Sequence, residues 1–287
     1  MNYNNLTIGI VTFKSEKVIF NCLKSIKKFK NIIIFDNSND KNLRIQIKKK
    51  FPHVKFILSK KNLGFGAGYN QIIKHTKSKY FFLISPDTIL NSKCVKNLMI
   101  IAKKIRDDFS IIAPKSNEIN YGFFNKKKGI QKLKNEILKV DYVKGFAMFF
   151  NLKKFKNKKI FDEKIFLYLE EIDLCRKIKK NNGKIFVVRN SYIKHLFAKS
   201  SNIGFEYVKC RNWHWMWSKF YYNKKYNGYF FGLLNTLPNF ISAFFKYYFY
   251  LLIRNKYKKV IYKMRLLGLL ASYMLKESYY RPYISKN

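Results

Sequence analysis

Short apolar runs recur through the first part of the chain and are separated by longer stretches of mixed polarity. The runs at 6–13, 32–35, 54–58 and 80–84 are largely hydrophobic, which is typical of strands buried on both faces of a parallel sheet. Between the first two runs, residues 15–29 place their apolar side chains on one helical face. Strands that alternate with helices in this way predict an α/β fold with a mainly parallel central sheet flanked by helices.

Polar residues directly follow two of the predicted strands. Asp36-Asn37-Ser38 ends the second run, and Ser85-Pro86-Asp87 ends the fourth. The carboxyl ends of parallel strands meet at one edge of the sheet, which is where ligands bind in open α/β folds. We therefore expect the binding site at this edge.

A glycine-rich stretch spans residues 62–70, with the sequence Asn-Leu-Gly-Phe-Gly-Ala-Gly-Tyr-Asn. Three glycines in five positions allow a tight turn and a close approach of the backbone to a ligand. Residues 71–77 read as a helix, so the loop would present free N–H groups at a helix start, which suits a diphosphate. An ordinary turn is the alternative, because the spacing matches neither a phosphate loop nor the dinucleotide motif Gly-x-Gly-x-x-Gly.

These segments, in this order, resemble the family 2 glycosyltransferases, and in particular their bacterial rhamnosyltransferase-like branch. The resemblance covers about residues 6–201 and implies a GT-A-type nucleotide-sugar-binding domain. The matching segments are Val11-Thr12-Phe13, Ile34 to Ser38, the glycine-rich stretch 62–70, Ser85-Pro86-Asp87, Gly145 to Met148, Phe161-Asp162-Glu163, Phe166 to Arg176, and His195 with Ser200 and Ser201.

The resemblance implies a divalent cation, Mg²⁺ or Mn²⁺, held by Asp87 and completed by His195. Hard oxygen ligands suit these ions, and the cation neutralises the charge that gathers on the departing diphosphate. The family's other acidic position is Ser85 in this chain. The alternatives are a helix cap for Asp87 and an ordinary structural histidine for His195.

The resemblance also implies the donor-binding residues. Asp36 would bind the base of the nucleotide, because a carboxylate accepts a hydrogen bond from a ring N–H, with Thr12 flanking the base. A simple turn is the alternative at Asp36. The residues expected around the ribose and diphosphate are Asn62, Gly64, Gly66, Gly68, Asn70 and Gly145.

Three acids, Glu170, Glu171 and Asp173, begin a predicted helix that ends near residue 180. The acceptor hydroxyl needs a general base, and in the family this is the second acid of the pair, normally Asp. That position is Glu171 here, whereas Glu170 and Asp173 share another helix face. Acids also favour a helix N-terminus through its dipole, so the choice between Glu171 and Asp173 stays open. A base opposite the leaving group implies inversion at the anomeric carbon.

The chain is strongly basic, with 59 Lys and Arg against 16 acidic residues and a formal net charge of +43. Lysines are spread along the whole chain and no nucleic-acid-reading module is present, so nucleic acid is not the expected partner. The charge favours nucleotide phosphates and anionic membrane surfaces. The four cysteines form no Cys-x-x-Cys pair and the N-terminus lacks the pattern of a signal peptide, so a cytoplasmic protein is expected.

Aromatic and apolar residues crowd into the last third, so we divide the chain into a catalytic domain at 1–201 and a helical region at 202–287. The region holds three tryptophans at 213–217, an interrupted apolar stretch at 229–253 and a basic amphipathic helix at 256–275. These features predict peripheral attachment to the anionic inner face of the cell membrane. A single span over 229–253 and an ordinary core helix pair are the alternatives.

The predicted function is transfer of a single sugar, with rhamnose suggested by the branch, from a nucleotide-diphosphate donor. The acceptor would be a saccharide, lipid-linked, in cell-surface polysaccharide synthesis. A degenerate, non-catalytic nucleotide-sugar-binding protein is one alternative. A processive polysaccharide synthase subunit is another, although Arg211-Asn212-Trp213 does not match the Q-x-x-R-W motif expected there.

Overall fold

The computed structural model describes residues 3–124, 136–196, 201 and 203–282. The chain divides into two compact units. The first, the α/β unit, comprises residues 1–162 and 171–202, and the second, the helical unit, comprises residues 163–170 and 203–287.

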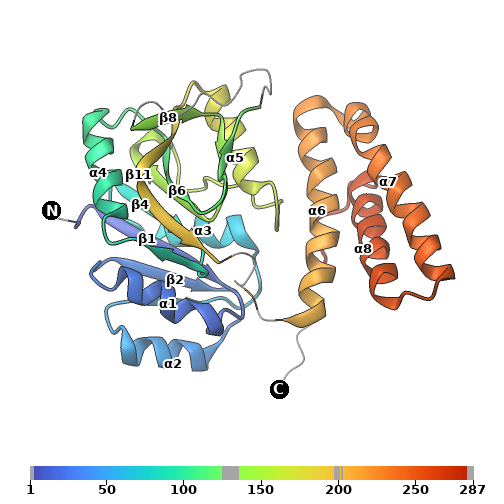
Figure 1. Cartoon of the computed structure of the whole chain (residues 1–287), viewed down its shortest axis with the longest axis horizontal. Helices are drawn as coiled ribbons and strands as arrows, with labels where there is room; N and C mark the ends of the chain where they lie inside the picture. The colour runs from blue at the N-terminus through green and yellow to red at the C-terminus, as the bar shows by residue number, and fades with distance from the viewer. Residues whose placement is uncertain (1–2, 125–135, 197–200, 202, 283–287) are drawn as a thin grey trace. The chain divides into compact units, whose positions relative to one another are not determined.

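The α/β unit is built on a nine-stranded sheet with the order β3-β2-β1-β4-β10-β6-β11-β5, and β8 pairs with β11 (Figure 1). Its strands are β1 (Leu6–Thr12), β2 (Ile32–Asp36), β3 (Lys55–Leu58), β4 (Tyr80–Ile84), β5 (Thr88–Leu90), β6 (Ile111–Ser116), β8 (Ile137–Val140), β10 (Ala147–Asn151) and β11 (Ile185–His195). Strands β3, β2, β1 and β4 are parallel, while β10 runs antiparallel to β4 and β6. A small separate ladder joins β7 (Tyr121–Gly122) to β9 (Tyr142–Val143).

Helices cover both faces of this sheet. Those in the α/β unit are α1 (Glu16–Ile26), α2 (Lys41–Lys50), α3 (Phe65–Lys74), α4 (Cys94–Lys104) and α5 (Glu170–Lys180), whose first residue is grouped with the helical unit. One core cluster joins α1, α2 and α4 to the sheet, and the other joins α3 and α5 to its opposite face. The predicted α/β fold with helices on both faces is thereby confirmed.

The limits of the elements agree with the apolar pattern in most places. Strand β4 and helix α5 begin and end where the sequence predicts. Helix α3 is the main correction, because it begins at Phe65 instead of near residue 71. Gly66 and Gly68 therefore lie in a helix and not in a loop. Of the three glycines in the stretch 62–70, only Gly64, with φ of 85°, is in the left-handed region that favours glycine.

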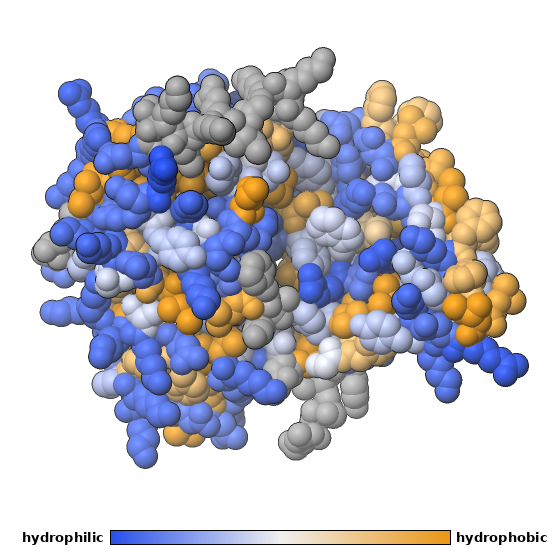
Figure 2. All heavy atoms as spheres, in the orientation of Figure 1, coloured by the Kyte–Doolittle hydropathy of each residue, from blue (hydrophilic) through white to orange (hydrophobic). Residues whose placement is uncertain are grey.

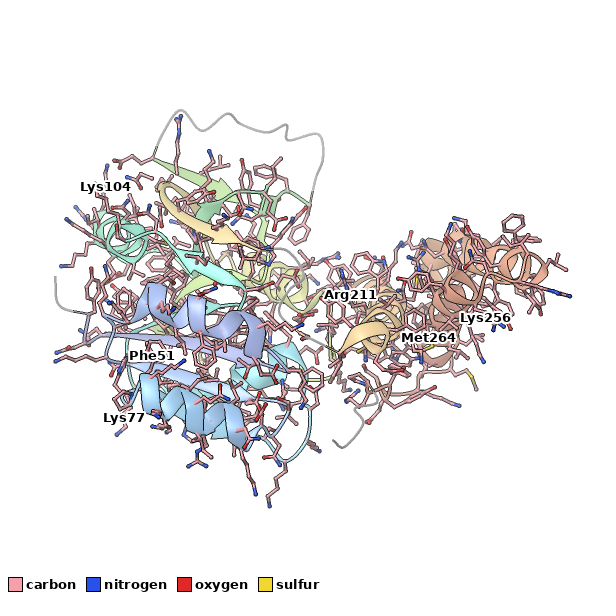
Figure 3. All side chains as sticks on the ribbon, turned by 60° about the horizontal axis from the view of Figure 1, so that its bottom comes forward. Phe51, Lys77, Lys104, Arg211, Lys256 and Met264 are labelled. Carbon is pink, nitrogen blue, oxygen red and sulfur yellow. The ribbon has the colours of Figure 1, made fainter. Side chains whose placement is uncertain are left out.

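The helical unit packs three helices together, namely α6 (Gly204–Asn227), α7 (Tyr229–Leu252) and α8 (Lys256–Tyr273). Trp213 and Trp217 of α6 pack with Met264 and Ala271 of α8 in its core, and Figure 3 labels Met264 on this unit. A Cβ on Gly268 would lie 2.3 Å from the carbonyl oxygen of Trp213, so the glycine permits the close approach of α8 to α6.

The burial of Trp213 and Trp217 corrects the interpretation of the tryptophan cluster as a membrane contact. Their exposed fractions are 1% and 3%, whereas Trp215 is 41% exposed. Among the described residues, the structure has no helix whose length and apolar content would let it cross a membrane.

Residues 163–170 are part of the helical unit. The hydroxyl of Ser218 donates a hydrogen bond to the carbonyl of Leu167 at 2.8 Å, and the ring of Phe166 lies 4.5 Å from that of His214. Arg211 donates to the hydroxyl of Tyr168. The aromatic part of the segment 166–176 is therefore anchored on α6.

Candidate active site

The carboxylate of Asp36, at the end of β2, is completely buried and accepts several local hydrogen bonds. Thr12 donates to Oδ1 at 2.8 Å, Ser38 donates to both oxygens, and the backbone N–H of Asp40 donates to Oδ2. Burial raises the pKa of Asp36, while these hydrogen bonds act in the opposite direction. Thr12 contacts Asp36 through its hydroxyl, and both lie at the carboxyl ends of neighbouring strands.

The glycine-rich segment is fixed to the end of β2 by Asn37, a residue that the sequence motifs did not single out for a role. Its amide donates to the carbonyl of Gly64 at 3.0 Å and accepts from the N–H of Leu63 at 2.9 Å. Asn62 accepts from the N–H of Gly64 at 3.0 Å. These bonds hold the start of α3 beside Asp36, so the predicted base and diphosphate residues do come together.

Gly66, Gly68 and Asn70 have packing roles in the structure. A Cβ on Gly66 would lie 2.9 Å from Phe161, and one on Gly68 would lie 3.0 Å from the methyl groups of Val11. The side chain of Asn70 is completely buried and exchanges hydrogen bonds with the backbone of Ile160 and Phe161. The three residues dock α3 on the sheet and on segment 160–161, and thereby position the N-terminus of the helix.

Asp87 lies beyond the end of β4, where it meets His195 at the end of β11. Oδ2 of Asp87 is 3.6 Å from Nε2 of His195, and the backbone N–H of Leu196 donates to the carbonyl of Asp87 at 2.9 Å. The carboxylate of Asp87 is 2% exposed and the imidazole 16%. The structure thus brings the two predicted metal ligands together.

His195 is held in place by two further neighbours. Nδ1 lies 2.7 Å from Oε1 of Glu118, and the imidazole stacks on Phe146 with ring centres 4.2 Å apart. Glu118 in turn pairs with Lys144. Burial alone would lower the pKa of His195, but the neighbouring carboxylates of Asp87 and Glu118 raise it on balance.

Glu118 and Lys144 were not singled out from the sequence. Glu118 lies just beyond the end of β6, much as Asp87 lies beyond β4 and Asp36 ends β2, and it is one of few acids in a basic chain. The position of Glu118 just after a strand was therefore the feature of the sequence that could have identified it as a site residue. Burial would raise the pKa of Glu118, but Lys144 and His195 lower it on balance.

The Asp87–His195 pair fits a divalent cation that is held partly by protein and partly by substrate. Two ligands of one octahedral ion lie about 3 Å apart, close to the observed separation. Among the described residues, no group of three or more His, Cys, Asp and Glu side chains could hold a metal. Such ions commonly bind one or two protein groups together with phosphates and water, so the small ligand set is compatible with a nucleotide-bound ion.

The three acids at the start of α5 differ in exposure. Glu170 and Asp173 are 4% and 1% exposed, while Glu171 is partly exposed. The Cβ of Glu171 would lie 3.4 Å from a Cβ on Gly145, and the ring of Phe65 would lie 3.3 Å from the same point. Glu171 and Phe65, the first residue of α3, thus both lie against Gly145.

These contacts form a continuous series across the carboxyl edge of the sheet. His195 stacks on Phe146, Gly145 precedes Phe146, and Glu171 lies against Gly145. Burial raises the pKa of Glu171, while backbone hydrogen bonds and the charge of Lys144 act against the rise. A carboxylate with a raised pKa is a better proton acceptor than an ordinary one, which suits a general base.

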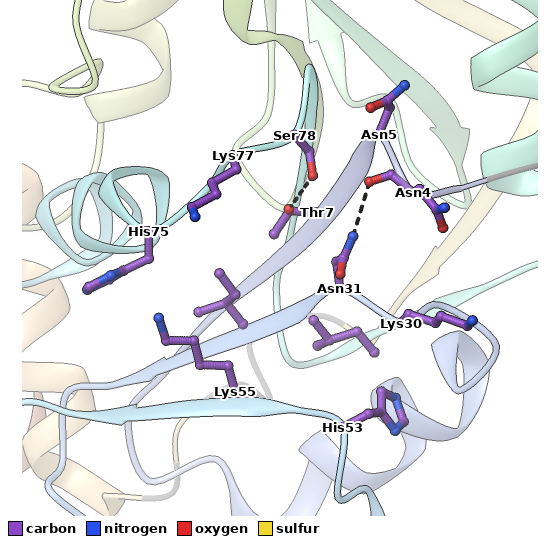
Figure 4. A pocket seen from close by; sticks show the side chains of 12 residues that line it. Asn4, Asn5, Thr7, Lys30, Asn31, His53, Lys55, His75, Lys77 and Ser78 are labelled. Atoms are coloured by element: carbon purple, nitrogen blue, oxygen red, sulfur yellow. Dashed lines mark hydrogen bonds between the residues drawn. The ribbon is translucent and has the colours of Figure 1, made fainter.

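A separate surface pocket of about 470 Å³ lies at the amino ends of β1, β2 and β3 (Figure 4). Its lining includes Lys30, Lys55 and Lys77 together with two histidines, His53 and His75. Burial and neighbouring lysines lower the pKa of His75. None of the predicted site residues lines this pocket, so the basic pocket and the candidate active site occupy opposite edges of the sheet.

Comparison with known proteins agrees with the geometry of the carboxyl edge. Residues 7–173 match the family described as glycosyl transferase family 2. The chain belongs to this family. The match extends from the first strand to Asp173 and so includes Asp36, Asp87 and Glu171.

Among curated proteins, the chain is similar to the low-salt glycan biosynthesis hexosyltransferase Agl10 of Haloferax volcanii, with 24% identity over 200 residues. The matched part is 63% of this chain and 64% of that relative, so slightly less than two thirds of its length is spanned.

Two solved structures share the fold. A mannosyltransferase from Pyrobaculum calidifontis, in complex with GDP-mannose and Mn²⁺, has a TM-score of 0.57 at 9% identity, with 95% of this chain and 88% of that chain covered. GalNAc-T7 with UDP, GalNAc and Mn²⁺ has a TM-score of 0.55 at 15% identity, with 78% and 51% covered. At such identities the likeness concerns the fold alone.

Proposed function

We propose that this family 2 glycosyltransferase moves a hexose from a nucleotide-diphosphate donor to a saccharide acceptor with inversion at the anomeric carbon. The main support is the contact series that leads from Asp87 through His195 and Gly145 to Glu171. The names of the relative and of the two similar structures, which include a hexosyltransferase and complexes with nucleotides and Mn²⁺, support the donor class. Rhamnose as the transferred sugar rests on the motif resemblance only.

The donor would lie along the carboxyl edge. Asp36 and Thr12 are paired at the carboxyl ends of neighbouring strands and would bind the base, and the N-terminus of α3 would offer backbone N–H groups to the diphosphate. Asp87 and His195 would hold a Mg²⁺ or Mn²⁺ ion, which when bound offsets the negative charge of the departing diphosphate. Glu118 would keep the imidazole of His195 oriented for this role.

Glu171 would act as the general base. Its carboxylate would take the proton from the acceptor hydroxyl while the hydroxyl oxygen forms a bond to the anomeric carbon. The bond from that carbon to the diphosphate oxygen breaks at the same time, and the nucleoside diphosphate leaves with the bonding electrons. Attack from the side opposite the leaving group inverts the anomeric configuration.

We also propose that residues 1–201 form the catalytic domain and that residues 202–287 hold the enzyme at the inner face of the cell membrane. Support comes from the basic and aromatic composition of the last third. A lipid-linked acceptor for surface polysaccharide would then lie in the same layer as the enzyme.

Thermal-shift measurements on the full chain would test the donor proposal. A panel of UDP-, GDP- and dTDP-sugars, each with and without Mn²⁺, should contain a compound that raises the melting temperature only with the metal. A ligand at a hundred times its Kd adds about 2.7 kcal/mol of stability. The Asp87→Ala variant should lose this shift, and the matched variant Asp108→Ala, at an exposed acid that pairs with Lys154 and Lys184, should keep it.

No shift with any donor, or the same shift in Asp87→Ala, would contradict the proposed metal and donor site. A metal-dependent shift without any turnover of the donor would instead identify a non-catalytic binding protein.

A further inference from the structure

Helix α7 packs against the rest of the helical unit through small residues together with Leu233 and Phe240, and it exposes most of its other large residues. Gly232, Thr236 and Ala243 are buried against the rest of the helical unit. A Cβ on Gly232 would lie 3.1 Å from both the backbone nitrogen of Lys224 and the ring of Phe220 in α6, so α7 approaches α6 closely there. Apart from Leu233 and Phe240, most of the bulky side chains of α7 are exposed and do not fill the unit's own core.

The exposed side of α7 is a nearly continuous apolar surface, which we call the α7 outer face. Phe230 and Phe245 are each 67% exposed, and Leu252 is 80% exposed. Figure 2 shows hydrophobic side chains gathered on the surface of the helical unit. The outer face also includes Phe231, Leu234, Leu237, Ile241, Phe244, Tyr248, Phe249 and Leu251.

The α7 outer face is much larger than the single exposed apolar residues that are common on protein surfaces. A helix of 24 residues is about 36 Å long, and monomeric proteins rarely leave an apolar patch of that extent in water. Lys246 is the only charged residue of α7. We therefore expect another molecule to cover the α7 outer face.

Charge favours an anionic bilayer over a second copy of the chain. Residues 203–287 contain 15 Lys and Arg and two acids, Glu206 and Glu277. Basic residues occur just before α7, at Lys224 and Lys225, and just after it, with Lys256 at the start of α8 (Figure 3). Two copies joined through α7 would bring like charges together, whereas anionic lipid headgroups would compensate them.

We propose that the α7 outer face inserts into the interfacial layer of an anionic membrane, with the helix axis parallel to the bilayer plane. Its aromatic and aliphatic side chains would lie at the boundary between headgroups and acyl chains, and the flanking lysines would contact lipid phosphates. This deepens the proposed membrane attachment by assigning it to one helix face. Trp213 and Trp217 take no part, because they are buried in the core of the unit.

Vesicle flotation with the full chain tests the proposal. Vesicles of phosphatidylcholine with phosphatidylglycerol, and of phosphatidylcholine alone, would be compared at low and high salt. The double variant Phe230→Gln/Phe245→Gln should bind anionic vesicles at least about tenfold more weakly than wild type, because each ring loses its apolar contact with lipid. The control Ile45→Gln/Ile100→Gln removes two exposed apolar residues of the α/β unit and should bind like wild type.

Circular dichroism on the same proteins shows whether the double variant is folded, and sedimentation velocity shows whether the wild type forms a dimer. Because the substituted rings are exposed, the double variant should keep its helical signal and melting temperature. Unchanged vesicle binding by a folded double variant would overturn the proposal, as would a wild type that ignores anionic vesicles. If the wild type sediments as a dimer and the double variant as a monomer, the α7 outer face is instead the contact with a second copy of the chain.

The donor-dependent thermal shift should be the same in the double variant and in wild type. If neither protein shows this thermal shift while the wild type still binds vesicles, the proposed enzyme function is refuted but the proposed membrane binding by the α7 outer face is not.

Discussion

The two units depart from the usual distribution of polar and apolar residues in opposite ways. In the α/β unit, Asp36, Asp87 and Asp173 are at most 1% exposed, although carboxylates are seldom fully buried. In the helical unit, Phe230 and Phe245 are two-thirds exposed, although large aromatic residues usually fill the core. Each departure costs stability, so each indicates a selected role.

The comparison separates two kinds of site. Buried acids at the end of a sheet are positioned by hydrogen bonds and neighbours, as Asp36 is by Thr12 and Ser38. Exposed rings on α7 have no such positioning, and only their combined apolar area matters. We therefore expect single substitutions to be severe at the first site and mild at the second.

The largest effect is expected at Glu171. Glu171→Gln keeps the shape of the side chain but cannot accept a proton, so kcat should fall by about 10²–10⁴-fold. Steady-state transfer to a water or saccharide acceptor measures the loss, and the donor-dependent thermal shift should remain. If Asp173→Asn loses activity while Glu171→Gln keeps it, the base is Asp173 and the fully buried acid is the functional one.

The contrast between buried and exposed aromatics can be measured within the helical unit. Trp213→Ala removes a ring that is 1% exposed and should lower the free energy of unfolding by about 3–5 kcal/mol. Phe245→Gln removes a ring that is 67% exposed and should change it by no more than about 0.5 kcal/mol. Urea unfolding curves compare the two, and a large loss in Phe245→Gln would mean that the outer face contributes to the fold.

A substitution at Glu118 tests whether this acid supports metal binding by His195. Glu118→Gln retains a hydrogen-bond acceptor for His195 but removes the negative charge that faces it at 2.7 Å. Such partners of a metal-binding histidine typically contribute 10–100-fold to metal affinity. Titration of Mn²⁺ at a fixed nucleoside diphosphate concentration should show a loss in that range, and an unchanged affinity would remove His195 or Glu118 from the ion site.

The stability of the helical unit should depend on pH through His214. His214 is buried; Nε2 lies 2.9 Å from the carbonyl of Tyr280, so it carries the proton, and Nδ1 accepts from Ser278. Burial lowers the pKa of His214 to about 3, against an ordinary value of 6.5. The unfolded state therefore binds more protons between these values, and stability is lost as the pH falls below 6.5.

The expected loss is about 1.4 kcal/mol per pH unit in this window. Urea unfolding of the helical unit at pH 6 and pH 5 measures it, with tryptophan fluorescence as the probe because all three tryptophans lie in α6. A His214→Asn variant should lose most of the pH dependence. An equal slope in both proteins would assign the acid sensitivity to other groups.

The sequence predicted the elements whose apolar pattern is unambiguous. Strands such as β4 are continuously apolar and buried throughout, so their limits could be identified directly. Helix α2 was missed because it is mostly polar and buries only Leu43 and Ile47. The start of α3 was misplaced because Gly66 and Gly68 disfavour a helix, and their close packing on Phe161 and Val11 was invisible in the sequence.

The site was predicted in part, for a related reason. Motif order brought Asp87, His195 and Glu171 into consideration, and the structure places them along one edge. The pairing of Glu118 with His195 joins positions 77 residues apart, and no local pattern encodes it. The face of α7 could not be assigned either, because its large residues surround the helix and only the packing of Gly232 and Ala243 identifies the inner side.

The position of a bound metal ion tests the central claim most directly. Crystals of the full chain grown with Mn²⁺ and a nucleoside diphosphate should give an anomalous peak about 2–2.5 Å from the carboxylate of Asp87 and from Nε2 of His195. The diphosphate should lie at the start of α3. A nucleotide bound instead in the basic pocket lined by Lys55 and Lys77, or a manganese peak away from Asp87, would contradict the proposed active site.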